Sequence, residues 1–123
     1  MITEFGKALR KLRIEEDERL LDMSKRINKS SAFISAVERG DKSPPMGFEE
    51  LVIVAYKLTE SSADELRSAA DASRRAFTIE PKSPLERDTA GLMARRMNST
   101  MNTLSADELE KILAILRKEG SDR

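Results

Sequence analysis

Residues 33 to 40 of this chain read Phe33-Ile34-Ser35-Ala36-Val37-Glu38-Arg39-Gly40. The three large apolar side chains in this stretch, at positions 33, 34 and 37, share one face of a helix. Either Ser30 or Ser31 can cap the start of this helix, and Gly40 is typical of the residue just past a helix end. The stretch therefore predicts a short helix whose outer side carries small side chains.

A second short helix is predicted directly before it, over residues 20 to 27. Leu20, Met23 and Ile27 lie on one side of that helix, and Ser24 is small enough to let another helix approach closely. Asn28 follows, and asparagine is among the few non-glycine residues that adopt the left-handed conformation of a sharp turn. The sequence thus predicts a helix, a turn and a helix in close succession.

The segment before this pair predicts a first helix. Thr3 can cap it, and Phe5, Leu9 and Leu12 form one apolar stripe along it. The acidic residues 15 to 18 then form a polar connection to the second helix.

Two more helices are predicted after the turn-rich residues 41 to 45. Residues 48 to 58 are apolar on most faces, which predicts a core helix against which the others pack. Ser62 followed by Glu65 forms a capping box for a fifth helix, over residues 63 to about 75.

The remainder of the chain predicts a linker and a helical hairpin. The linker contains a short extended piece at Thr78-Ile79, and Ser83, Pro84 and Glu86 then start a helix that runs to about residue 101. Ser105 and Glu108 start a last helix that ends near Lys118, about four residues after the previous one, which favours an antiparallel pair. We therefore expect an all-α protein with a five-helix domain over residues 1–76, a linker over 77–83 and a C-terminal hairpin over 84–123.

Composition limits the classes of function. The 123 residues include no cysteine and no histidine, which argues against hydrolytic triads and zinc sites, and there is no glycine-rich phosphate loop. We therefore expect no enzyme, no metal and no cofactor. No stretch is apolar enough for a membrane span and the first residues do not resemble a signal peptide, so we expect a soluble, cytoplasmic protein.

The charges cancel to a net charge of zero, so there is no global basic field that would attract nucleic acid. Between residues 24 and 44, however, five basic residues face only two acidic ones. The basic residues are Lys25, Arg26, Lys29, Arg39 and Lys42, and the acidic ones are Glu38 and Asp41. Any DNA footprint must therefore come from this local arrangement.

The stretch from residue 33 to 40 resembles the ISxIERG ending of the recognition helix in the xenobiotic-response-element-like family, to which lambda repressor and Cro belong. Residues 20 to 27 fit that family's second helix, and Leu9-Arg10-Lys11-Leu12-Arg13 fit its first, so the resemblance covers about residues 3 to 58. Ser24 and Asn28 stand where the family usually has alanine and glycine, and both meet the same steric demand. Leu20 stands where many members have a glutamine that contacts phosphate.

This resemblance implies a helix-turn-helix domain of the lambda-repressor type whose third helix enters the major groove of double-stranded DNA. It assigns four small residues to the base edges, namely Ser31, Ala32, Ser35 and Ala36. Because none of these makes a bidentate contact to a base, we expect DNA shape or neighbouring Lys29 to supply much of the sequence preference. Ser31 has the alternative role of a helix cap.

The same resemblance implies contacts to the sugar-phosphate backbone from residues that flank the second and third helices, namely Arg19, Lys29, Arg39, Lys42 and Ser43. It also implies that Glu38 pairs with Arg13 of the first helix. Such a pair would neutralise an acid on a helix that approaches DNA, and direct base reading by Glu38 is the alternative.

The predicted hairpin is rich in leucine, isoleucine and methionine. An operator with two half-sites about 34 Å apart favours a two-fold protein, so we expect these side chains to form a homodimer or partner interface. The alternative is that they close a small core with the fifth helix. The residues are Leu92, Met93, Met97, Met101, Leu109, Ile112, Leu113 and Leu116.

Together these features predict a homodimeric transcriptional repressor, of bacterial or prophage origin, that binds a palindromic operator. An antirepressor protein is the partner that we would expect to release it. The alternative is an antitoxin that represses its own operon and binds a toxin through the C-terminal region.

Overall fold

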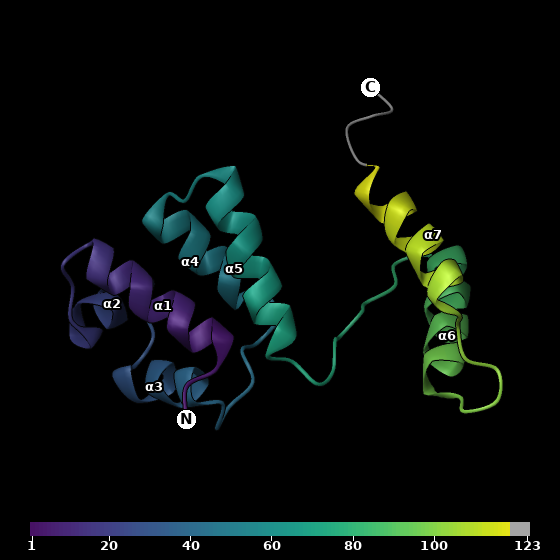
Figure 1. The fold of residues 1–123 in the computed structure, drawn as a ribbon, viewed down its shortest axis with the longest axis horizontal. Helices are drawn as coiled ribbons and strands as arrows, with labels where there is room; N and C mark the ends of the chain where they lie inside the picture. Colours follow the sequence, from purple (N-terminus) through teal and green to yellow (C-terminus); the bar gives the residue numbers. More distant parts are fainter. Residues whose placement is uncertain (119–123) are drawn as a thin grey trace. The chain divides into compact units, whose positions relative to one another are not determined.

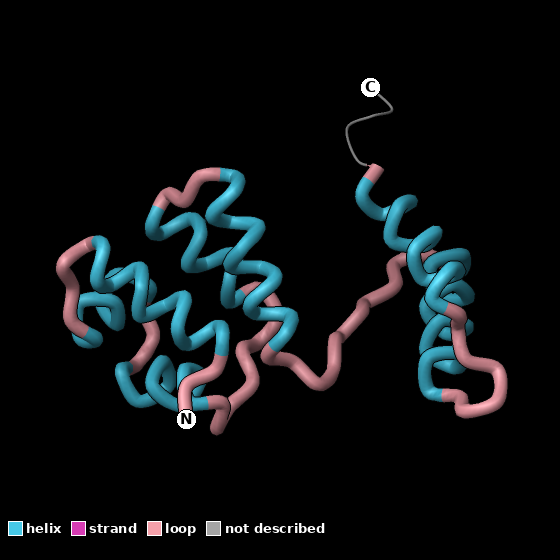
Figure 2. Tube along the Cα trace, viewed as in Figure 1, coloured by secondary structure: helices cyan, strands magenta, loops and turns pink. Residues whose placement is uncertain are grey.

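The computed structural model describes residues 1–118, and over that range the chain is all-α, as predicted, with no strand (Figure 2). The described part of the chain contains seven helices, which are labelled in Figure 1. They are α1 (Glu4–Glu15), α2 (Leu20–Ile27), α3 (Ser31–Arg39), α4 (Phe48–Tyr56), α5 (Glu60–Ala72), α6 (Pro84–Asn98) and α7 (Ala106–Arg117).

The chain forms two compact units, one over residues 1–78 and one from residue 79 onward. This boundary lies within the expected linker, whose extended piece at residues 78–79 pairs with no strand in the described part of the chain. Among the described helices, none has both the length and the apolar character that crossing a membrane requires.

The first unit is built around one apolar core. Helix α1 packs against α3 and α5, α2 packs against α3 and α4, and α4 packs against α5. The ring of Phe48 lies at the centre, with its centroid 5.8 Å from that of Phe5 and 5.6 Å from that of Phe33, both edge-on. All five helices contribute buried side chains: Phe5, Leu9, Met23, Ile27, Ile34, Val37, Phe48, Val52, Leu66 and Ala70.

Helix α4 contributes Phe48 and Val52 to the core, as expected of a core helix, but part of its apolar surface is left uncovered. Besides α2 and α5, it contacts Phe5 of α1 and Phe33 of α3 through Phe48. Its outer face nevertheless stays in solvent, where Val54 is 74% exposed and Leu51 is also exposed. The helix ends at Tyr56, earlier than predicted, because Lys57 adopts the left-handed conformation with φ 50° and ψ 50°.

The predicted start of the fifth helix is also wrong. Helix α5 begins at Glu60, and its cap is Thr59, whose hydroxyl oxygen accepts a hydrogen bond from the backbone N–H of Ser62 at 3.2 Å. Ser62 therefore lies inside the first turn and does not precede the helix. The helix ends at Ala72, before the predicted Arg75.

The second unit contains the hairpin of α6 and α7. Pro84 and Ser83 start α6 as predicted, but the helix ends at Asn98 because the Ser99 hydroxyl accepts hydrogen bonds from the backbone N–H groups of Met101 and Asn102. The connection is therefore longer than predicted, over residues 99–105, and Met101 lies in it with its side chain in solvent. Within the described residues, neither helix of the hairpin has a buried side chain.

Candidate nucleic-acid interface

Helices α2 and α3 are joined by a three-residue turn with the geometry that the sequence predicts. Asn28 is left-handed, with φ 57° and ψ 46°, and it ends α2. The Ser24 hydroxyl donates to the backbone carbonyl of Lys29 at 2.5 Å, which ties the turn back to α2. Ser30 caps α3 by accepting from the N–H of Phe33 at 3.0 Å, so Ser31 is the first helical residue and not the cap.

Glu38, the acidic residue of α3, is buried and paired with arginine from α1. The guanidinium of Arg13 contacts both of its carboxylate oxygens, at 2.5 and 3.2 Å. Arg10, which we did not expect to take part, donates from Nε to the same carboxylate at 3.3 Å. Glu38 is only 2% exposed, so α3 presents no acidic side chain on its outer face.

The end of α3 also contacts the start of α1 through the backbone. Both the N–H and the hydroxyl of Thr3 donate to the carbonyl of Glu38, at 2.9 and 3.2 Å. Gly6 lies against the same carbonyl, and a Cβ atom at this position would be 2.3 Å from the oxygen. The absence of a side chain at position 6 therefore allows α1 and α3 to pack this closely.

The outer face of α3 is smaller than predicted. Of the four residues expected to face DNA bases, only Ala32 is exposed, whereas Ser31, Ser35 and Ala36 are half-buried. The hydroxyl of Ser35 also accepts a hydrogen bond from the guanidinium of Arg39, which is paired with Asp41 at 3.0 Å. In the unbound protein, Arg39 is therefore already engaged by its neighbours.

Two lysines flank this face. The Nζ atoms of Lys29 and Lys42 lie 5.9 and 5.8 Å from the centroid of the Phe33 ring, within the range of a cation–π interaction. Lys29 comes from the turn before α3 and Lys42 from the loop after it, and both residues are exposed. The two ammonium groups thus gather around one aromatic ring near the start of α3.

The other two residues expected near the DNA backbone are Arg19, before α2, and Ser43, after α3. Arg19 precedes α2 with its side chain 82% exposed, and its Nε lies 3.5 Å from the carboxylate of Asp22. The backbone N–H of Arg19 donates to that carboxylate at 2.8 Å, which lowers the pKa of Asp22. Ser43 is exposed in the loop between α3 and α4.

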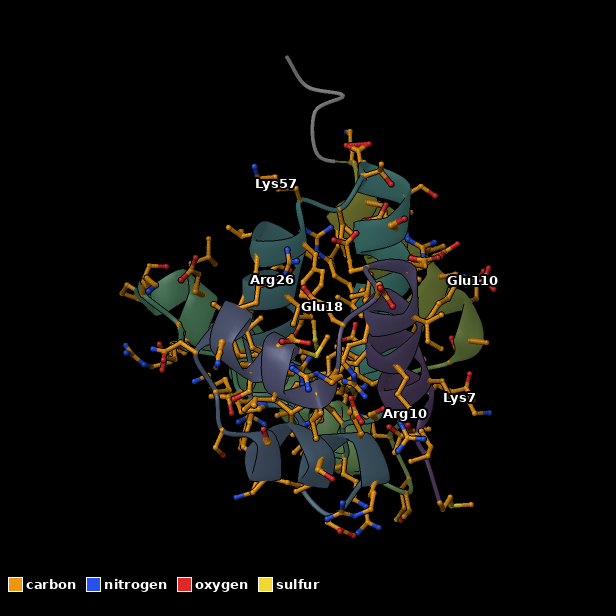
Figure 3. The ribbon with its side chains drawn as sticks, turned by 90° about the vertical axis from the view of Figure 1, so that its left-hand side faces the viewer. Lys7, Arg10, Glu18, Arg26, Lys57 and Glu110 are labelled. Carbon is orange, nitrogen blue, oxygen red and sulfur yellow. The ribbon has the colours of Figure 1, made fainter. Side chains whose placement is uncertain are left out.

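Arg26, one of the five basic residues near α3, has a structural role. Its guanidinium donates to Glu18 and lies 4.3 Å from the centroid of the Tyr56 ring, and Figure 3 shows Arg26 beside Glu18. The Tyr56 hydroxyl donates to the other oxygen of Glu18 at 2.6 Å. Burial and this hydrogen bond raise the pKa of Tyr56. Arg26 therefore anchors the connection before α2 to α4.

Arg74, at the end of α5, holds the loop that follows α3. It forms an ion pair with Glu49 at 2.6 Å, and both side chains are almost fully buried. Burial raises the pKa of Glu49, but the hydrogen bonds and the charge of Arg74 outweigh it, so this pKa lies below its ordinary value. No sequence pattern identifies Arg74, because its other acceptors include backbone carbonyls, which every residue has.

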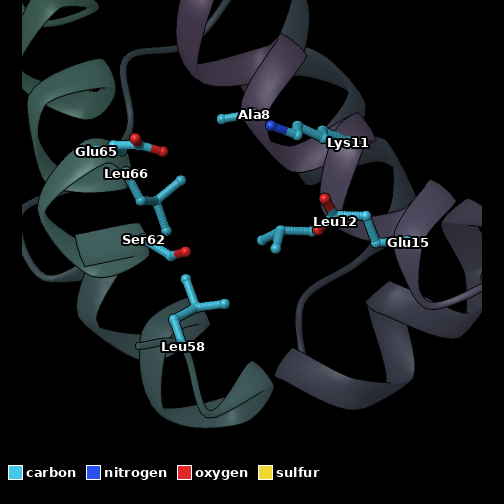
Figure 4. A pocket seen from close by; sticks show the side chains of 8 residues that line it. All are labelled: Ala8, Lys11, Leu12, Glu15, Leu58, Ser62, Glu65 and Leu66. Atoms are coloured by element: carbon cyan, nitrogen blue, oxygen red, sulfur yellow. The ribbon is translucent and has the colours of Figure 1, made fainter. Parts of the chain in front are cut away.

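The first unit also has a small hollow between α1 and α5, shown in Figure 4. Leu12, Leu58 and Leu66 line it, with Lys11 and Glu65 at its edge. Its volume is about 110 Å³, whereas pockets for small molecules are usually about 300–1,000 Å³. The hollow is therefore too small for an organic ligand. Among the described residues, no cluster of acidic side chains could hold a metal ion.

The hairpin has a larger apolar groove of about 580 Å³. Its lining comes from both helices and includes Leu92, Met93, Ile112 and Leu116 from the expected interface. Most of that set is exposed, while Met93 and Ile112 are half-buried.

Comparisons of the chain with models of protein families, with curated proteins and with solved structures found no significant match.

Proposed function

We propose that this chain is a sequence-specific, double-stranded-DNA-binding transcriptional repressor, and that residues 1–76 form a helix-turn-helix domain of the lambda-repressor type. The observation that carries the proposal is the outer face of α3. Its one acid, Glu38, is buried between Arg13 and Arg10, while the exposed residues Lys29 and Lys42 precede and follow the helix and bring their ammonium groups to the Phe33 ring.

This arrangement suits a helix that enters the major groove. The groove is about 12 Å wide and admits one helix, and the phosphates on its two sides attract the cations that flank the helix. Ala32 is the only exposed member of the expected base-reading set, so direct readout in the conformation described is limited to apolar contacts such as a thymine methyl. We therefore propose that DNA shape supplies much of the sequence preference.

In this proposal, Arg39 contacts a DNA phosphate only when DNA is bound and otherwise stays paired with Asp41. Its bonds to Ser35 and Asp41 are exposed, so the guanidinium can exchange Asp41 for a phosphate at little cost. When the Arg39 guanidinium moves to a phosphate, the Ser35 hydroxyl also becomes free to bond to a base edge. Arg39 and Ser35 would then act together, as a backbone contact and a base contact.

The hairpin supports the proposal that the repressor is a homodimer. Two helices of this length cannot form a core alone, and within the described residues α6 and α7 have no buried side chain. A second hairpin would cover the exposed leucines and the groove, and two DNA-binding units would then match a palindromic operator. An antirepressor, or a toxin in the case of an antitoxin, would compete for the same apolar surface.

Selection of bound duplexes from a random DNA pool tests the proposal. We expect a two-fold symmetric site whose half-sites are about one helical turn apart. The purified chain, without added protein, should bind this site. Absence of binding to any duplex at low salt would contradict the proposal, and a protein that binds DNA only in complex with a toxin would favour the antitoxin.

Salt titration with single variants then tests the placement of DNA on α3. Replacing Lys29 or Lys42 with alanine should lower the slope of log affinity against log salt by about one, as expected for one lost phosphate contact. K57A is the matched control, because Lys57 is exposed but lies at the opposite end of the unit from α3 (Figure 3). Equal slopes for all three variants would place the DNA elsewhere.

A further inference from the structure

All five N–H groups of the Arg74 guanidinium are used. Nε donates to the carbonyl of Pro44 at 2.9 Å, and Nη2 donates to the carbonyl of Pro45 at 2.6 Å. The remaining three bonds go to Glu49 at 2.6 and 3.1 Å and to Asp71 at 3.3 Å. Because a guanidinium has five donors in a rigid plane, Arg74 fixes the two proline carbonyls relative to α4 and α5.

The two carbonyls belong to the loop over residues 41–47, which connects α3 to α4. The first half of this loop is held by its own backbone, since the N–H groups of Asp41 and Lys42 donate to the carbonyl of Ala36 at 2.9 and 3.2 Å. In the second half, Pro44 and Pro45 have no N–H group, and the backbone contributes only the bond from the N–H of Phe48 to the carbonyl of Pro45 at 3.0 Å. Arg74 supplies the missing donors from a distant part of the chain.

We infer that Arg74 is a positioning residue for DNA binding, which holds Lys42 and Ser43 beside the end of α3. This inference rests on the proposed function. Lys42 and Ser43 lie between the two anchored parts of the loop, so they keep one position only while both anchors are intact. Arg74 itself is 8% exposed and has no donor left for a phosphate.

An ion pair that only joins α4 to α5 would affect neither the loop nor DNA binding, and the chain contains such an ion pair. Arg67 of α5 donates to both oxygens of Glu50 on α4, at 2.7 and 3.0 Å. It also contacts Asp64 at 3.0 Å but makes no hydrogen bond to the loop among the described contacts. Arg67 is therefore a matched control for Arg74.

The test compares R74K and R67K in the full chain, with circular dichroism as the check of folding. Lysine keeps the charge but cannot bond both carbonyls and the carboxylate together. In the protein without DNA, we expect the amides of Lys42 and Phe48, which donate to the carbonyls of Ala36 and Pro45 at 3.2 and 3.0 Å, to exchange hydrogen at least about tenfold faster in R74K. The loop then opens locally, while the amides inside α3 stay protected. R67K should exchange like the wild type.

DNA binding supplies the second readout. We expect R74K to lower the slope of log affinity against log salt by about one, and R67K to leave it unchanged. In a double-mutant cycle, K42A should cost less affinity in the R74K background than in the wild type, because the two changes remove the same contact. Additive effects in a folded R74K, or a loop that exchanges at the wild-type rate, would overturn the inference.

Two outcomes keep the inference separate from the proposed function. If the wild type binds no duplex, the proposed function fails, and the exchange rates still report whether Arg74 holds the loop. If R74K does not fold, the wild type supplies the readout. The guanidinium protons of Arg74, which is 8% exposed, should exchange with water at least about tenfold more slowly than those of Arg67, whose side chain is 42% exposed. Equal exchange rates for the two guanidinium groups would then overturn the inference.

Discussion

Gly6 lies where α1 crosses the end of α3, and its replacement tests how closely the two helices must pack. In G6A, the new Cβ atom would lie 2.3 Å from the carbonyl oxygen of Glu38, which is backbone and cannot rotate away. We expect a loss of about 1–3 kcal/mol in the free energy of unfolding, as for other overpacked sites. Urea unfolding followed by circular dichroism measures this change.

Gly91 provides the control, because it is also a glycine inside a helix. A Cβ atom there would lie 3.6 Å from the guanidinium of Arg95, an ordinary contact with a flexible side chain. G91A should therefore leave stability unchanged or raise it slightly, since alanine favours the helix over glycine by roughly 0.5–1 kcal/mol. A G6A variant as stable as the wild type would show that the contact between α1 and α3 is looser than described.

At the scale of single residues, the sequence predicts a side-chain contact best where only one kind of partner is chemically suitable. An acid on the helix that approaches DNA needs a partner, and the resemblance to a known family identified Arg13 for Glu38. Arg10 was missed because it is half-exposed and gives no sign of an inward role. Arg74 was missed for another reason: two of its partners are proline carbonyls, and every residue has a carbonyl.

At the scale of elements, the start of α5 is the sharpest difference between expectation and structure. Thr59 and Ser62 are both suitable caps, three residues apart, and each is followed by a possible first turn. The structure uses Thr59 because α4 ends at the left-handed Lys57, and a helix can begin again two residues later. Helix ends of this kind depend on the preceding element, which local patterns do not describe.

Two alanine substitutions test this helix start. T59A removes the side chain that accepts from the N–H of Ser62, so we expect a loss of about 1 kcal/mol in the free energy of unfolding. S62A changes an exposed residue inside the first turn and should alter stability by less than about 0.5 kcal/mol. The opposite order of the two effects in thermal or urea unfolding would support a helix that begins at residue 63.

The predicted helix bounds agree best with the structure where a residue typical of a helix end follows the helix. Helix α2 spans Leu20–Ile27, as predicted, because Asn28 ends it in the left-handed conformation. Helix α3 ends before Gly40, whose φ is 80°, a value that favours glycine. Helix α4 is followed by no glycine or asparagine, and the predicted helix is longer than the observed one. Because the segment is apolar on most sides, its composition does not indicate which face is in solvent.

At the scale of the whole molecule, the two units differ in what they bury. Residues 1–78 bury a core of ten apolar side chains and tie their helices with internal ion pairs, whereas the described part of the hairpin buries none. An unpaired hairpin of this kind has little to offset the conformational entropy lost on folding. The proposed dimer would bury the exposed apolar side chains of the hairpin. We therefore expect the hairpin to be stable only when the dimer forms.

Leu92 allows a direct test of this link, because it lines the groove of the hairpin and is 55% exposed. In L92E, a charge would have to be buried in the dimer, so light scattering should report a mass near 13.8 kDa in place of twice that value. Operator affinity should fall roughly 10²- to 10⁴-fold, the gain that linking two binding units provides. I14E adds the same charge at a 78% exposed isoleucine of α1 and should remain dimeric. If L92E stayed dimeric with full affinity, the hairpin would not join the two copies, and its apolar face would be left for a different protein.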